Sequence, residues 1–401
     1  MNESNLPAGP ADRIGPAWPD ASETPAQPPA RRRLPIEFTG SGSEYFRIWI
    51  VNLLLSIVTL GLYLPFAKAR RLSYFYSNTL IDGHALAFHG NPWKMLRGFV
   101  LLALLMGAYA LAGQLSPIGA VIAFGVLCIV WPALWRASLR FRLANTSWRG
   151  LRFGFRGDLA GAYKAVAPVY LPTLALVIVG ALVRAQVETR ATPDQAALQQ
   201  LLMWNGGAVL LLMLLSPWAL ALIKRYQHGG YAYAGQRSEL KLTTWRFYTL
   251  ALKFAGLLLA PIFLLGIVIA LLIPLFRFGP GVAFFLIGAG YLLMLALALP
   301  YGTARLQDLV WNGTQSAELR FHSALKFWPL AGLTLANWLL TAVTLSLYRP
   351  FATVAQTRMR LAAMNIELSG ELDAWQAQAA GDYQDASGEA AGDFFGIDMG
   401  L

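Results

Sequence analysis

Cationic and aromatic side chains gather beside the apolar stretches of this 401-residue chain, and their chemistry suits phosphate. Ammonium and guanidinium groups pair with phosphate oxygens, and tryptophan rings favour the headgroup layer of a bilayer. The candidates for this contact are Lys68, Arg70, Arg71, Arg140, Arg142, Trp93 and Trp148. We therefore predict an interface with the lipid bilayer, and with anionic lipid headgroups on its cytoplasmic face.

Two amides in apolar surroundings occupy equivalent places in a repeated phrase. The phrase that begins at Asn52 reads NLLLSIVTLGLYLPFAKARR, and the phrase that begins at Asn337 reads NWLLTAVTLSLYRPFATVAQ. Eleven of the twenty residues coincide without a gap. In a transporter, both amides would be candidates for binding the substrate. The simpler interpretation is that each amide hydrogen-bonds a neighbouring helix, at about 0.6–2 kcal/mol.

Signs of catalysis are missing from the sequence. It contains no Walker loop and no GxSxG, HExxH or kinase motif. The four histidines are His84, His89, His228 and His322. A metal site needs converging ligands, whereas the position equivalent to His89 in the next loop is Arg156. We therefore expect no enzyme activity, no metal and no cofactor.

The composition is that of a membrane protein. Hydrophobic residues make up 56% of the chain and charged residues only 13%, whereas soluble proteins carry about 25% charged residues. The net charge of +11 also suits a nucleic-acid-binding protein. However, the basic residues lie between apolar stretches rather than on one soluble domain, so we expect no nucleic-acid partner. Cys128 is the single cysteine and excludes an intrachain disulfide. The oligomeric state stays open.

Six apolar runs are long enough to cross a hydrocarbon layer of about 30 Å, which needs roughly 20 helical residues. They form three pairs, 98–115 with 117–135, 166–183 with 201–223, and 250–276 with 282–300. The four loops that flank the pairs hold 20 lysines and arginines, whereas the connections within the pairs hold three. Because positive loops stay in the cytoplasm, each pair is predicted to enter the membrane from the cytoplasm and return there.

The two copies of the phrase leave two topologies open. Segments 45–66 and 330–351 are apolar enough for simple spans, with both chain ends outside. A simple span, however, places one of the basic segments beside the second copy on the outer side. Pro65 and Pro350 suit a bent, re-entrant pair of helices with both ends inside. Such irregular backbone must be buried in protein or line water.

The basic loops resemble one another and predict small β-hairpins. In the first loop, Asp82-Gly83 stands between alternating apolar residues, which is a strong hairpin signal because both turn positions need positive φ. Similar patterns recur around Gly150, Gly235 and Gly313. A lone hairpin is marginal in water, so the hairpins either pair together or lie flat at the headgroups. The predicted fold is an all-α polytopic membrane protein with six transmembrane helices, two spanning or re-entrant segments and small cytoplasmic β-hairpins.

Both ends of the chain differ from its middle. Residues 1–36 are rich in Pro, Ala, Ser and Gly and predict a disordered tail. Residues 373–401 are acidic and rich in small residues, and they predict a flexible tail. The multi-span membrane domain is predicted to occupy residues 37–372.

Three stretches carry a family resemblance: EYFRIW at 44–49, TLGLYLPFAKARR at 59–71, and YFYSNT at 74–79. They resemble the YjgN family of bacterial inner-membrane proteins, whose domain has no assigned function. The resemblance implies a multi-pass protein of the bacterial inner (plasma) membrane and no reaction. The second phrase departs from the pattern, since Arg349 replaces an apolar residue and TVAQ replaces KARR.

Two classes of function stay open. A transporter-like or channel-like role is favoured by the repeats and by the bent, Pro-rich and Gly-rich spans, and it predicts a polar cavity near Asn52 and Asn337. A non-catalytic scaffold or lipid-interacting role is favoured by the lack of charge at the membrane midplane and by the aromatic, basic loops. The second role predicts tightly packed spans without a cavity.

Overall fold

The computed structural model describes residues 31–188, 195–276 and 280–369. The predicted tails therefore lie largely outside the described residues. Within the described part, ten helices connect eleven strands. The helices are α1 (Gly42–Val58), α2 (Leu64–Ser77), α3 (Pro92–Leu115), α4 (Pro117–Ala144), α5 (Leu159–Glu188), α6 (Gln195–His228), α7 (Thr244–Phe276), α8 (Pro280–Asn312), α9 (Phe327–Val343) and α10 (Arg349–Ala362).

The strands are short and lie between the helices in sequence. They are β1 (Arg31–Phe38), β2 (Thr79–Ile81), β3 (His84–Phe88), β4 (Thr146–Trp148), β5 (Leu151–Phe155), β6 (Tyr231–Tyr233), β7 (Gln236–Arg237), β8 (Glu239–Leu240), β9 (Thr314–Gln315), β10 (Leu319–Ser323) and β11 (Met364–Ser369). Strand β1 begins inside the segment that the sequence assigned to the N-terminal tail.

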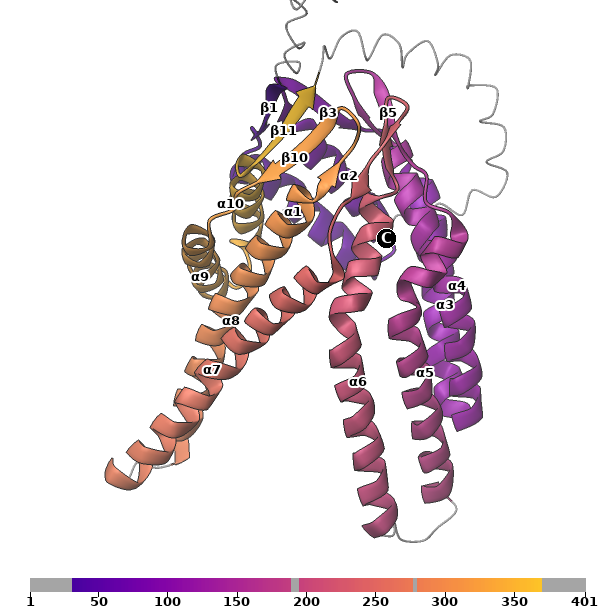
Figure 1. The fold of residues 1–401 in the computed structure, drawn as a ribbon, viewed down its shortest axis with the longest axis vertical. Helices are drawn as coiled ribbons and strands as arrows, with labels where there is room; N and C mark the ends of the chain where they lie inside the picture. Colours follow the sequence, from indigo (N-terminus) through magenta and orange to yellow (C-terminus); the bar gives the residue numbers. More distant parts are fainter. Residues whose placement is uncertain (1–30, 189–194, 277–279, 370–401) are drawn as a thin grey trace, which may run out of the picture.

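Helices α3 to α8 confirm the six predicted spans. Among the described residues, these six are long and apolar enough to cross a membrane. They extend from one side of the strands as antiparallel pairs, α3 with α4, α5 with α6, and α7 with α8 (Figure 1). Their side chains are mostly exposed, and none in the most apolar window of α7 is buried. Lipid, rather than protein, is the solvent that makes such helices stable.

Each copy of the repeated phrase forms a helical hairpin, two helices joined by a turn, and not one continuous helix. Helix α1 ends at Val58, the chain reverses, and α2 begins at Leu64. Helices α9 and α10 repeat this arrangement. Strand β1 leads into α1, α2 leads into β2, and β1 pairs with β2. Both ends of the first hairpin therefore lie on the side of the strands, and its tip is apolar, with Leu60 94% exposed.

The two hairpin tips share the same hydrogen bonds. In the first, the Gly61 N–H donates to the Ser56 carbonyl at 2.7 Å, and in the second the Ser346 N–H donates to the Thr341 carbonyl at 2.7 Å. Gly61 has a φ of +90° and Ser346 a φ of +74°. Glycine adopts this left-handed conformation freely, whereas serine does so at a cost in free energy. The hydrogen-bonded turn is therefore the same despite the change from glycine to serine.

An Asn-Thr pair ends α2 and α4 and starts the strand that follows each of them. The side chain of Asn78 donates to the Tyr74 carbonyl, and that of Asn145 donates to the Phe141 carbonyl, both at 2.9 Å. Thr79 bonds its helix in a similar way. The last turn of a helix leaves carbonyls without partners, and these side chains satisfy two of them. The same short motif thus ends the helix, and its threonine is the first residue of the following β-hairpin.

The strands form one antiparallel sheet, so the all-α prediction was wrong. The eleven described strands are ordered β7-β6-β5-β4-β3-β2-β1-β11-β10-β9-β8. The edge strands β7 and β8 are consecutive in the chain and flank Ser238. The sheet therefore curves back toward its own first edge, above the ends of the helices (Figure 1). The hairpins are marginal one by one, but as neighbours they bond each other.

One face of the sheet is apolar and buried. Leu34 and Ile366 are cross-strand partners on this face, with 0% and 6% of their surface exposed. On the other face, Arg33 pairs with Glu367 at 3.4 Å. At the start of β1, Arg32 pairs with Asp82 of the β2–β3 turn at 2.7 Å. Alternation of apolar and polar residues is what a sheet with one buried face requires. The sequence assigned these arginines to a solvated tail, whereas the structure places them in strand β1.

Candidate functional site

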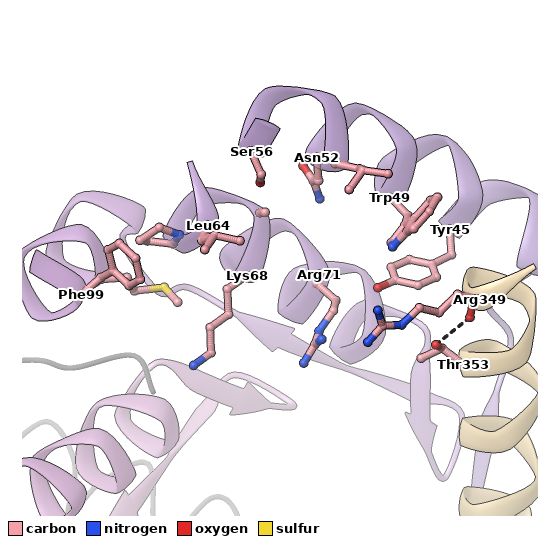
Figure 2. A pocket seen from close by; sticks show the side chains of 14 residues that line it. Tyr45, Trp49, Asn52, Ser56, Leu64, Lys68, Arg71, Phe99, Arg349 and Thr353 are labelled. Carbon is pink, nitrogen blue, oxygen red and sulfur yellow. Dashed lines mark hydrogen bonds between the residues drawn. The ribbon is translucent and has the colours of Figure 1, made fainter. Parts of the chain in front are cut away.

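A cavity of about 490 Å³ lies where α1, α2, α3 and α10 meet. Both hairpins contribute to it, because α1 and α2 come from the first copy of the phrase and α10 from the second. Figure 2 shows the side chains that line it. The size falls within the range of about 300–1,000 Å³ that is typical of small-molecule sites.

One side of the cavity is cationic. Lys68 and Arg71 come from α2, and Arg349 comes from the start of α10. Figure 2 shows the three side chains in a row, below Asn52 and Ser56. Among the described residues that line the cavity there is no aspartate and no glutamate. Three cations without a lining carboxylate create a positive potential that favours an anionic ligand.

Lys68 is the most buried of the three cations. Burial, together with the smaller effect of the neighbouring cations Arg142 and Arg71, lowers the pKa of its ammonium group from 10.5 to about 8. The charged form is therefore destabilised relative to water. A bound anion would relieve this destabilisation, so the site gains from accepting negative charge.

The rest of the cavity lining is mostly apolar and carries one amide. Asn52 is 8% exposed, and its Oδ1 has no hydrogen-bond partner. Leu53 and Phe99 also line the cavity, as does Leu64, which lies one helical turn before Lys68 on α2. A buried polar atom without a partner is costly, so a ligand hydroxyl or a water molecule would satisfy Oδ1. The cavity is thus amphipathic, because its lining combines three cations, one amide and several apolar groups.

Asn337 does not share the cavity with Asn52. It is 2% exposed, and its Nδ2 lies 3.5 Å from the Ala352 carbonyl of α10. The geometry fits the simpler interpretation of an amide that links two helices. The equivalent residues of the two phrases therefore differ in surroundings, and only Asn52 lines the cavity.

The other predicted interface residues are dispersed. Arg70 lies 5.7 Å above the Tyr63 ring on the outside of the hairpin, and Arg140 is exposed on α4. Trp93 is 64% exposed in the first turn of α3, as an interfacial tryptophan would be. Trp148 is only 4% exposed and belongs to the core of the sheet, so its prediction as a headgroup contact was wrong.

Arg142 lines a different cavity, and Arg349 was not among the predicted site residues. Sequence analysis singled out Arg349 only as a departure from the repeated phrase, at the position of Leu64 in the first copy. That departure was the available signal, because an arginine in an apolar phrase must find water, a partner or an anion. The pairing of α1 with α10, which brings Arg349 to Lys68 and Arg71, is not visible in either phrase alone.

These features define a class of protein: a polytopic α-helical membrane protein with two additional helical hairpins and a sheet over the helix ends. The chain belongs to the family described as bacterial protein of unknown function (DUF898), whose model matches residues 33–394. No solved structure matches the chain.

Relatives support the same assignment. The inner membrane protein YjgN of Salmonella typhimurium (strain LT2) is 24% identical over 359 residues, which cover 84% of this chain and 88% of the relative. The inner membrane protein YjgN of Escherichia coli O157:H7 is 31% identical over 150 residues, which cover 36% of each chain. The resemblance to YjgN is confirmed, and the protein is a multi-pass protein of the inner membrane.

Proposed function

We propose that the protein binds an anionic amphiphile, an anionic membrane lipid, in the cavity between its two helical hairpins. A binding role, rather than an enzymatic one, is proposed. The observation that carries it is the amphipathic lining: the cations Lys68, Arg71 and Arg349, several apolar groups, and no lining carboxylate among the described residues. Each cation near a membrane surface attracts an anionic headgroup by about 1 kcal/mol.

A lipid suits the site better than a soluble anion. Leu53 and Leu64 line the cavity and are also 37% and 48% exposed on the outside of the first hairpin. Their neighbours Val58 and Leu60 are more exposed still, at 79% and 94%. The apolar part of the cavity lining therefore continues into a surface that lipid chains would cover. A soluble anion would leave this apolar part without a partner.

Lipid selectivity tests the proposal. The protein in phosphatidylcholine nanodiscs would be titrated with short-chain phosphatidylglycerol, short-chain phosphatidylcholine and glycerol phosphate, and binding would be measured by calorimetry. We expect saturable binding of phosphatidylglycerol, at least about tenfold tighter than either control, since one control lacks net charge and the other lacks chains. Equal affinity for all three, or no binding, would contradict the proposal.

The pH dependence of this binding follows from Lys68. Its pKa in the free protein is about 8, so the ammonium is charged below that pH and loses its proton above it. Affinity for phosphatidylglycerol should therefore fall as the pH rises from about 7 to about 9, while the phosphodiester stays ionised. Lys68→Arg keeps its charge over this range and should flatten the profile. The same slope in both proteins would exclude Lys68 as the titrating group.

Transport is a second candidate function. A transporter was predicted to have a polar cavity near Asn52, whereas a scaffold was predicted to have tightly packed spans without a cavity, and a cavity does lie at Asn52. Asn52→Ala removes the amide that has no partner and should lower uptake of a transported solute into vesicles by about tenfold. The matched control is Asn365→Ala, since Asn365 also has a buried oxygen without a partner but lies on β11. Unchanged uptake of every solute offered would count against transport through this cavity.

A further inference from the structure

A second cavity, of about 470 Å³, lies between the sheet and the ends of the helices. We call it the chamber. Its lining comes from strands on both halves of the sheet and from α2, α4, α6 and α8. The lipid cavity uses other residues, so the chamber is a separate space.

Aromatic rings dominate the wall of the chamber. Trp148, Phe153 and Tyr233 line one part of it, with ring centroids 4.7 Å apart for Phe153–Tyr233 and 5.6 Å apart for Trp148–Tyr233. Trp311 and Phe321 line another part, with centroids 5.0 Å apart. Such rings prefer offset or edge contacts with a further ring, so the wall suits a flat conjugated ligand.

The polar atoms of Trp148 and Tyr233 already have partners in the protein. Trp148 donates its Nε1–H to the Ile81 carbonyl at 3.3 Å, and Tyr233 donates its hydroxyl to the Trp148 carbonyl at 3.0 Å. Neither group therefore needs a polar ligand. What these side chains offer a guest is mainly apolar ring surface, which favours a guest whose body is apolar and planar.

Two cations complete the lining. Arg142 comes from α4 and Lys224 from α6, and Lys224 Nζ lies 3.1 Å from Gln227 Oε1. Within the described ranges, no carboxylate lines the chamber and neither cation forms an ion pair. A cation over an apolar aromatic wall attracts an anion, since charge-assisted hydrogen bonds are stronger than neutral ones.

We propose that the chamber is a binding site for a small organic anion with a flat aromatic body, held by Arg142 and Lys224. The rings supply the contact area and the two cations fix the orientation of the acidic group, as in sites where few polar groups act within an apolar pocket. This site does not depend on the lipid proposal, because it shares none of its lining residues.

The probe for the test is 2-naphthoate, titrated by calorimetry into the full chain in phosphatidylcholine nanodiscs, with empty nanodiscs subtracted. We expect saturable binding with one site, and at least about tenfold weaker binding of the uncharged 2-naphthamide. Arg142→Gln and Lys224→Gln should each weaken naphthoate binding about tenfold. Arg152→Gln, an exposed arginine on β5, is the matched control and should change nothing.

Three outcomes would overturn the proposal: no saturable binding, equal affinity for the acid and the amide, or unchanged affinity in both cation variants. Within the described structure, and apart from the backbone bonds of α4, Arg142 forms a hydrogen bond only through its backbone carbonyl, which Arg142→Gln retains. This variant therefore keeps the test decisive if Lys224→Gln does not fold. Variants of Arg71 and Arg349 should leave naphthoate binding intact. A loss of naphthoate binding in those variants would place the probe in the lipid cavity and contradict the assignment.

Discussion

Replacing Arg71 and Arg349 together by glutamine is expected to weaken phosphatidylglycerol binding about 30-fold. The two guanidinium groups line the lipid cavity from different hairpins, and both side chains are exposed enough to be screened by water. At about 1 kcal/mol for each cation near a membrane surface, the loss is about 2 kcal/mol, and 1.4 kcal/mol corresponds to tenfold. Calorimetry in phosphatidylcholine nanodiscs measures the change directly.

A control variant distinguishes the effect of the cavity cations on phosphatidylglycerol affinity from the effect of the net charge of the protein. Arg152→Gln with Arg156→Gln removes the same two charges from exposed positions on or beside β5. If the cavity binds the headgroup, this variant should bind within about twofold of the wild type, because exposed charges beyond a Debye length of about 10 Å are screened. Similar losses in both variants would mean that net charge, and not the cavity, determines binding.

Leu34→Ala is expected to lower the free energy of unfolding by about 2–5 kcal/mol. Leu34 is completely buried on β1 and packs in the core of the sheet with Trp148 and Ile366. Removing its branched end loses buried apolar contact and leaves a void that the sheet fills only in part. Titration with denaturing detergent, followed by circular dichroism, would measure the loss.

The matched substitution for Leu34 is Glu37→Ala on the same strand. Glu37 is exposed on the polar face, so its replacement should change stability by less than about 0.5 kcal/mol. Equal, small effects at both positions would show that β1 does not contribute to the core. Such a result would also contradict the pairing of β1 with β2 and β11.

The six spans and their paired arrangement could be predicted because membrane insertion depends on local properties. A run such as 250–276 is apolar over its whole length, and hydrocarbon accepts helices of that kind without help from other segments. The position of basic residues then sets which ends lie together. The hairpin turns were also visible, since Asp82-Gly83 and Gly150 carry the residues that positive φ requires.

The sheet and the composition of the site could not be predicted in the same way. Strands of two to eight residues from distant loops form the sheet, and their pairing is decided by tertiary contacts that no single loop encodes. Trp148 illustrates this, because an aromatic residue in a basic loop suits a headgroup layer and a core equally well. Asn52, Lys68 and Arg71 were candidates from the sequence and line the same cavity, but their meeting with Arg349 depends on contact between α1 and α10.

Strand β1 pairs with β2 on one side and with β11 on the other. The ribosome makes β2 soon after β1, whereas β11 follows more than three hundred residues after β1. During translation, the edge of β1 that pairs with β11 therefore stays unpaired while the intervening helices enter the membrane. Assembly of the sheet, and of both cavities beneath it, is completed only when the last strand leaves the ribosome. An exposed strand edge of this kind can pair with a wrong strand, so the interval before β11 is made is the stage at which mispairing of β1 is most favoured.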